Sequence, residues 1–252
     1  MHVRDVGDLL WKERLPQHVL DQLKVAMGSW AFAGQYQQAP APLEGGTIKY
    51  DWLKFYRELP ARFDYVLQSW DCSFKESKDS DYVVGQVWGR ASTQSAAGRS
   101  AQYYLLDQVR GKMDFVGTKN AIRAMSAKYP QAVTKLIEDK ANGPAVISAL
   151  KAEVDGMIAV NPEGGKESRM NSVSALFEAG NVFLPEAERA PWTHDYMHEL
   201  CTFPKAAHDD EVDATSQALF DPLWGLVDPA AGAWFPQQAL DLAKRANPAL
   251  LP

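Results

Sequence analysis

The chain is poor in cysteine and has no long apolar run. Among its 252 residues only Cys72 and Cys201 are cysteines, and they lack the spacing of metal ligands. Reduced thiols are therefore expected, rather than a disulfide framework or a zinc site. No stretch approaches the roughly 20 apolar residues that cross a bilayer, and the N-terminal residues contain no apolar signal core. These absences predict a protein that has no membrane partner and works in the cytoplasm.

The sequence also lacks a Gly-x-x-x-x-Gly-Lys-Ser/Thr motif, the loop that holds phosphates in many nucleotide hydrolases. Basic residues are in the minority, with 26 Lys and Arg against 32 Asp and Glu, so the net charge is -6. This balance argues against a general nucleic-acid coat protein, which needs a cationic surface. It does not exclude a nuclease, because bound metal ions reverse the field around clustered carboxylates.

What the chain does have is the composition of an ordinary globular protein, 46% hydrophobic and 23% charged. We expect two parts. Within residues 1–60 the sequence predicts three segments. They are a helix over 16–29, a linker rich in Ala, Gln, Gly and Pro over 31–46, and a short amphipathic docking segment around Trp52. Residues 61–252 are expected to form the domain proper, which is long enough to bury a sizeable core.

Apolar and β-branched patterns predict that this domain is α/β. Strands over 67–74, 81–89 and 102–110 are spaced as an antiparallel sheet, with a loop of small polar residues over 91–100. Short strands and helices then alternate, which is typical of parallel strands joined by helices. The later strands are predicted over 133–137, 157–160 and 182–184, and the later helices over 118–129, 144–151, 166–179, 193–202 and 209–220. We therefore expect a mixed sheet, with antiparallel hairpin strands plus parallel strands, flanked by helices.

Acidic residues stand at the ends of two of the predicted strands. Asp71 lies where the apolar character of the first strand ends, and Glu138 and Asp139 directly follow the fourth strand. A buried carboxylate is costly unless a cation compensates its desolvation. If the two strands are neighbours, Asp71 and Glu138 meet at one edge of the sheet.

A third acidic group begins the last predicted helix. Spacings of three and four residues put Asp213 on one helix face with Asp210 and Asp209. Three or four carboxylates around one cleft suit two hard divalent ions about 4 Å apart, the arrangement that hydrolyses phosphodiesters. Taken alone, each group also suits a structural role, as a strand end in water, a solvated turn or a helix cap.

Three segments that carry these acids resemble a known family. They are Ser69–Asp71, Leu136–Gly143 and His208–Ala214, and together they resemble the nuclease domain of the large terminase subunit of tailed bacteriophages. The resemblance extends over nearly the whole chain. Residues Trp30–Gln38 are similar to the segment that joins the packaging ATPase to the nuclease. Further positions between the second and third motifs also match, namely Asn161, Pro162, Lys166, Arg169 and Gly180–Pro185.

The resemblance implies a ribonuclease H-like fold and an endonuclease that cuts concatemeric viral DNA with two Mg²⁺ or Mn²⁺ ions. Within the third motif the family uses one or two acids, and we favour Asp210. The implied catalytic residues are then Asp71, Glu138 and Asp210, and the wider candidate metal set adds Asp139, Asp209 and Asp213.

The implied partners are double-stranded DNA, the terminase ATPase domain, the small terminase subunit and the portal protein, in the host cytoplasm. Because the phosphate loop is missing, either the ATPase belongs to a longer protein or the gene is a remnant. This chain alone cannot translocate DNA. The candidate phosphate contacts flank the acidic motifs and are Lys140, Lys166, Arg169 and Lys205.

Two other functions remain open. A Holliday-junction resolvase-like nuclease on the same fold would share the acids but bind DNA of a different shape. The joining segment at 30–38 argues against it. The second alternative is a non-catalytic prophage remnant that acts as an assembly module.

Overall fold

Seven strands and six helices are found in the part of the chain that the computed structural model describes, which is residues 11–36, 46–72, 82–95, 98–140, 142–162 and 164–220. The strands are β1 (Lys54–Tyr56), β2 (Tyr65–Asp71), β3 (Val83–Ser95), β4 (Gly98–Gly111), β5 (Thr134–Glu138), β6 (Met157–Val160) and β7 (Val182–Pro185). The helices are α1 (Gln17–Gln35), α2 (Phe115–Lys128), α3 (Gly143–Leu150), α4 (Lys166–Glu178), α5 (Thr193–Thr202) and α6 (Asp210–Leu219), with a 3-10 turn at Tyr50–Trp52.

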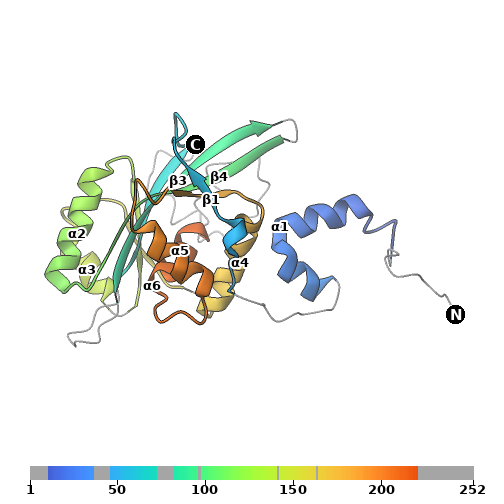
Figure 1. Cartoon of the computed structure of the whole chain (residues 1–252). Coiled ribbons are helices and arrows are strands. Elements are labelled where there is room, and N and C mark those ends of the chain that lie inside the picture. The colour runs from blue at the N-terminus through green and yellow to red at the C-terminus, as the bar shows by residue number, and fades with distance from the viewer. Residues whose placement is uncertain are drawn as a thin grey trace.

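All seven strands join one sheet in the order β1-β7-β4-β3-β2-β5-β6 (Figure 1). The central strands β2, β3 and β4 pair antiparallel, while β5 and β6 extend the sheet in parallel from β2. On the other side β7 and β1 extend it in parallel from β4. The predicted mixed sheet with flanking helices is therefore confirmed.

The predicted elements are all present, and β6 and α5 have the predicted bounds. The predicted loop over 91–100 is wrong, because β3 continues to Ser95 and β4 starts at Gly98. Small polar residues there carry no apolar alternation, yet their backbones pair across the hairpin. The predicted linker is wrong for 31–35, where the Ala-containing sequence continues α1. Residues 37–45 of that linker and the tail from 221 lie outside the described residues.

The predicted docking segment contributes a strand to the sheet. β1 forms its edge beside β7, pairing Phe55 with Leu184. The residues around β1 also enter the core, since Ile48 and Leu53 are buried in the same cluster as Leu184. In the structure, the segment from Ile48 to Tyr56 therefore packs as part of the sheet domain.

Side chains on the two faces of the sheet form two separate cores. Along β2, Leu67 belongs to the core under α4, α5 and α6, whereas Val66 and Trp70 belong to the core under α2 and α3. This alternation follows from the two-residue period of a strand. The same alternation holds in β5, where Leu136 and Ile137 face opposite ways.

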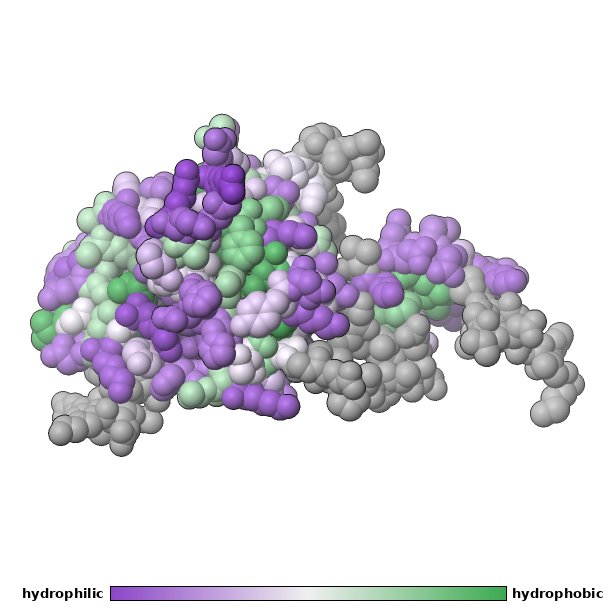
Figure 2. Space-filling model, in the orientation of Figure 1, coloured by the Kyte–Doolittle hydropathy of each residue, from purple (hydrophilic) through white to green (hydrophobic). Residues whose placement is uncertain are grey.

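The outer surface is of mixed polarity. Hydrophilic residues cover much of the face seen in Figure 2, with smaller hydrophobic areas between them. Among the described helices, none is both long enough and apolar enough to cross a membrane.

Gly143, the first residue of α3, provides a test of how tightly α3 packs on the end of β5. A Cβ added at Gly143 would lie 1.9 Å from the backbone oxygen of Glu138. Gly143→Ala should therefore lower the unfolding free energy by about 1–3 kcal/mol, as overpacking does. Gly111→Ala is the matched control, because its Cβ would meet only the side chain of Met113, whose nearest atom lies 3.2 Å away. The control should stay within about 0.5 kcal/mol of the parent. Equal denaturant midpoints for both variants would contradict the close approach.

Candidate active site

Two acidic side chains end neighbouring parallel strands. The register pairs Trp70 of β2 with Ile137 of β5, so Asp71 and Glu138 follow at the same edge of the sheet. The strands that carry the two acids are therefore neighbours, which is the condition under which the acids meet at one edge. By the alternation of each strand, both acids point to the face that α6 covers. Asp71 is only 3% exposed, and the Glu138 side chain is 12% exposed. Both carboxylates are thus held largely out of water.

Helix α6 brings a third carboxylate to this edge. Asp71, Glu138 and Asp213 line one small cavity of about 10 Å³, about the space of a single water molecule. The remaining lining residues are Pro162, Arg169, Ala214 and Gln217. Asp210, which is buried in the first turn of α6, is not among them. Asp213 is therefore the acid of α6 that lines this cavity together with Asp71 and Glu138.

Polar contacts fix α6 against the two acid-bearing strands. The Ser69 hydroxyl donates to the backbone oxygen of Ala214 at 2.8 Å. Gln217 donates to the Ser69 hydroxyl at 3.0 Å, and its amide nitrogen lies 3.4 Å from the backbone oxygens of both Trp70 and Leu136. One side chain of α6 thus contacts both strands immediately before their acids.

Two cations already pair with Asp213. Arg169 donates to Oδ1 of Asp213 at 2.5 Å, and Lys166 Nζ lies 2.6 Å from Oδ2. Lys166 also donates to Asp209 Oδ1 at 2.7 Å. Burial lowers the pKa of Lys166, but the hydrogen bonds that its ammonium donates to Asp209 and Asp213 outweigh burial and raise that pKa, so the amine remains cationic. Lys140 is more loosely placed, with Nζ 3.6 Å from Glu138 Oε1.

On the side of α6 away from the acidic cavity, a second set of polar residues, from α5 and β4, contacts the helix. Glu199 of α5 accepts from the backbone nitrogens of Glu211 and Val212 at 2.7 and 3.4 Å, which caps the start of α6. Its other oxygen accepts from Arg110 of β4 at 3.0 Å. Gln108 donates to the side chain of Glu211 at 2.5 Å. Burial, followed by the charge of Glu199, raises the pKa of Glu211 to about 8, so Glu211 keeps its proton at neutral pH.

The structure separates the predicted site residues into groups. Asp71, Glu138 and Asp213 share the cavity, with Arg169 beside them. Asp209 is bonded to Lys166 rather than lining the cavity. Asp139 is exposed in the loop after β5, and Lys205 is exposed after α5. Within the described ranges, no three His, Cys, Asp or Glu side chains are grouped closely enough to hold a metal ion as they stand.

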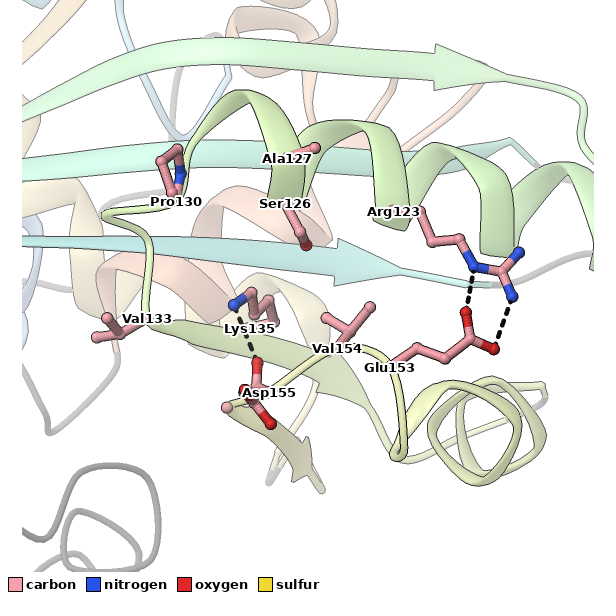
Figure 3. A pocket seen from close by; sticks show the side chains of 10 residues that line it. Arg123, Ser126, Ala127, Pro130, Val133, Lys135, Glu153, Val154 and Asp155 are labelled. Atoms are coloured by element: carbon pink, nitrogen blue, oxygen red, sulfur yellow. Dashed lines mark hydrogen bonds and ion pairs between the residues drawn. The ribbon is translucent and has the colours of Figure 1, made fainter.

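A larger pocket lies at the opposite end of β5 (Figure 3), with a volume of about 660 Å³. Its charged groups are bonded within the protein. Arg123 makes two hydrogen bonds with Glu153, at 2.8 and 3.0 Å, and Lys135 donates to the backbone oxygen of Asp155 at 2.9 Å. Size alone therefore does not identify the site, since the acidic side chains converge at the other end of the strand.

A comparison with models of known families identifies the family of the chain. Residues 68–221 match the family model described as the terminase RNaseH-like domain. The chain belongs to this family. The match begins in β2 and ends just after α6, so it spans every element that carries an acid of the cavity. The fold of this terminase domain is accordingly ribonuclease H-like.

Solved structures of terminase nucleases also resemble the chain, at low identity. The large terminase nuclease of thermophilic phage G20c with bound magnesium is 17% identical, with a TM-score of 0.46 over 71% of this chain and 98% of that one. The nuclease domain of the large terminase from bacteriophage SPP1 with bound Mn is 18% identical, with a TM-score of 0.46 over 68% and 97%. The nuclease domain of Thermus phage P74-26 is 14% identical, with a TM-score of 0.41 over 67% and 88%. No curated protein matches the chain significantly.

The donor set of the terminase domain suits hard divalent ions. Its three cavity acids supply carboxylate oxygens, the ligands that Mg²⁺ and Mn²⁺ prefer. The paired cations Lys166 and Arg169 show that this group of acids attracts positive charge. The cavity acids Asp71, Glu138 and Asp213 are therefore of the ligand type that such ions need, although in the described residues they are not grouped closely enough to bind an ion without moving.

Sequence reasoning missed the residues that position α6. Gln217, Ser69 and Glu199 carry no pattern that distinguishes them from surface or core polar residues. Their roles depend on contacts between segments far apart in the chain, such as Glu199 with Arg110. The one available signal is that Ser69 lies within the strand that ends in Asp71 and belongs to the recognised motif.

Replacing Glu199 tests whether the cap of α6 supports the fold. Glu199→Ala should lower the unfolding free energy by about 1.5–3 kcal/mol, because Arg110 and the first amides of α6 lose their charged acceptor. Glu153→Ala is the matched control, since it breaks another Arg–Glu pair that is solvent-exposed. Thermal unfolding should show a clear decrease for the first variant and almost none for the second. The same small change in both would rule out a supporting role for Glu199.

Proposed function

We propose that this chain is the metal-dependent endodeoxyribonuclease domain of a DNA-packaging terminase, and that it cuts concatemeric double-stranded DNA. The observation that carries the proposal is the small cavity at which Asp71, Glu138 and Asp213 converge from β2, β5 and α6. Membership of the terminase RNaseH-like family supports DNA as the substrate. We place the activity in the host cytoplasm, where the packaging partners would meet it.

The strand acids have a defined part in this reaction. Asp71 and Glu138 present two carboxylates from adjacent, rigid strand ends, and α6 adds Asp213 above them. When bound there, two Mg²⁺ or Mn²⁺ ions would supply the attacking hydroxide and stabilise the leaving oxygen. Arg169 holds the Asp213 carboxylate in place from the protein side. Asp210 remains a candidate that supports the site from the same helix turn.

Basic residues around the cavity give the domain modest DNA contacts. Lys140 is exposed next to Glu138, and Lys166 stands at the start of α4. A handful of such contacts gives non-specific affinity on the order of 10⁻⁴ to 10⁻⁶ M at physiological salt. We propose that the ATPase domain, small terminase subunit and portal then hold the nuclease beside its substrate, which raises the effective concentration.

Substitution of the cavity acids tests the assignment. Asp71→Asn, Glu138→Gln and Asp213→Asn should each leave less than about a tenth of plasmid nicking, a loss of more than ~1.4 kcal/mol of transition-state stabilisation. Asp71→Asn and Glu138→Gln should retain the fold, because each removes one of several mutually repelling charges. Asp213→Asn should also lower the melting temperature, because Arg169 loses its charged partner, so its nicking is measured below that temperature. Asp195→Asn is the control, since Asp195 is exposed on α5, and it should keep full activity.

The choice of the third acid has its own test, in which Asp210→Asn should lose less nicking activity than Asp213→Asn. The reverse order would return the third position to Asp210.

Metal addition and removal provide an independent test. Mg²⁺ or Mn²⁺ should raise the melting temperature by binding only the native state, with about 2.7 kcal/mol of stabilisation at a hundredfold excess over the dissociation constant. The shift should be absent in Asp71→Asn, and chelator should abolish nicking. Nicking that persists in excess chelator would exclude the metal mechanism. If the folded protein binds no divalent ion and cuts no DNA, the assembly-module function is supported instead. If it cuts branched DNA much better than linear duplex, the resolvase function is supported.

A further inference from the structure

The two cations bonded to Asp213 differ in how firmly they are held. The Arg169 side chain is only 10% exposed and also donates to the backbone oxygen of Gly164 at 3.1 Å. The Lys166 side chain is 45% exposed, and among the described residues its ion pairs are with the carboxylates of Asp209 and Asp213. Arg169 is therefore a fixed partner of Asp213, whereas Lys166 can leave without exposing a buried group.

Lys166 also borders an open cleft that has room for its amine. Lys166 lines an open cleft of about 930 Å³ between α1 and α4, shared with Gly165, Ser168 and Asn171. Asp209 lies in the same cleft, while Asp213 lines the acidic cavity on the other side of Lys166. The ammonium thus stands between the acidic cavity and a wide cleft of mixed polarity.

Charge balance indicates what a divalent ion would do to this contact. In the structure, the charges of Lys166 and Arg169 balance those of Asp209 and Asp213. Arg169 pairs with Oδ1 of Asp213, and Lys166 pairs with Oδ2. An ion that binds Asp71, Glu138 and Asp213 needs an oxygen of Asp213 and repels a neighbouring ammonium. Lys166 and the ion therefore compete for the same oxygen.

We propose that Lys166 is a displaceable cation that couples metal binding to DNA binding. It holds Asp213 Oδ2 until a divalent ion takes that oxygen, and its freed ammonium then binds a backbone phosphate of DNA at the cleft. This inference rests on the proposed nuclease function and assigns Lys166 a regulated role as a positioning residue. Since coupling is reciprocal, DNA also strengthens metal binding by the same factor.

The reactivity of the Lys166 amine tests displacement directly, without activity. The purified chain is labelled with a lysine-acylating reagent in chelator, in calcium, and in calcium with a duplex, and the label is located by mass spectrometry. Calcium is used because it binds oxygen sites but places the attacking water poorly. Labelling of Lys166 should rise severalfold in calcium and fall again with DNA. Lys128 is the control, because its 2.7 Å pair with Asp107 is outside the acidic cavity, and it should not change.

Duplex affinity measured against salt tests the coupling. In calcium, Lys166→Met should reduce the slope of log affinity against log salt by about 0.9, the value for one lost phosphate contact, and should leave the slope in chelator unchanged. Calcium should raise wild-type affinity for DNA about fivefold or more, and this gain should shrink in Lys166→Met but not in Lys128→Met.

The outcomes separate this inference from the proposed function. If the wild type binds divalent ions and nicks DNA, but Lys166 labels equally with and without calcium, displacement is wrong and the nuclease assignment stands. If Lys166→Met lowers the slope equally in calcium and chelator, Lys166 is a permanent phosphate contact and the coupling is wrong. If the wild type binds no divalent ion by calorimetry, both proposals fail together.

Discussion

The parallel pairing of β2 with β5 is the constraint on which the rest of this domain depends. Both strands are covered on their two faces, and each ends in a carboxylate at the same edge. Two nearby carboxylates that are shielded from water repel each other and lose hydration, so the edge is stable only with compensation. Helix α6 and the cations of α4 supply part of that compensation, and the cavity that results is the candidate site.

Helix α6 makes two different contacts on its two sides. Toward β2 and β5 it presents Asp213 and Gln217, which reach the acids and the strand backbones. Toward β3 it presents Glu211 and Thr215, whose partners include Gln108 and Gln86. Because one helix contacts both the acid-bearing edge and a buried polar group, the position of Asp213 depends on residues of α5 and β4 that do not line the cavity.

Local pattern and motif recognition predicted most of the fold and part of the site. The order of the strands in the sheet could be predicted only from the family resemblance. The pairing of β4 with β7, for example, joins two segments that share no local sequence signal. Asp71 and Glu138 were predictable because apolar runs end at them. The choice between Asp210 and Asp213 was not, since both lie on acceptable faces of an ideal helix and only the packing of α6 decides which one enters the cavity. The pairing of Lys166 with Asp213 was unpredictable for the same reason.

The three cavity acids come from widely separated parts of the chain, which has a consequence for when the site forms. Each lies in a different structural segment, and Asp213 is on the last described helix. Contacts of such long sequence separation are among the slowest to form during folding. A growing or truncated polypeptide that contains β2 and β5 but not α6 therefore has two strand acids and no complete cavity. A site that needs all three carboxylates is therefore assembled only after α6 has been synthesised and has packed against the sheet.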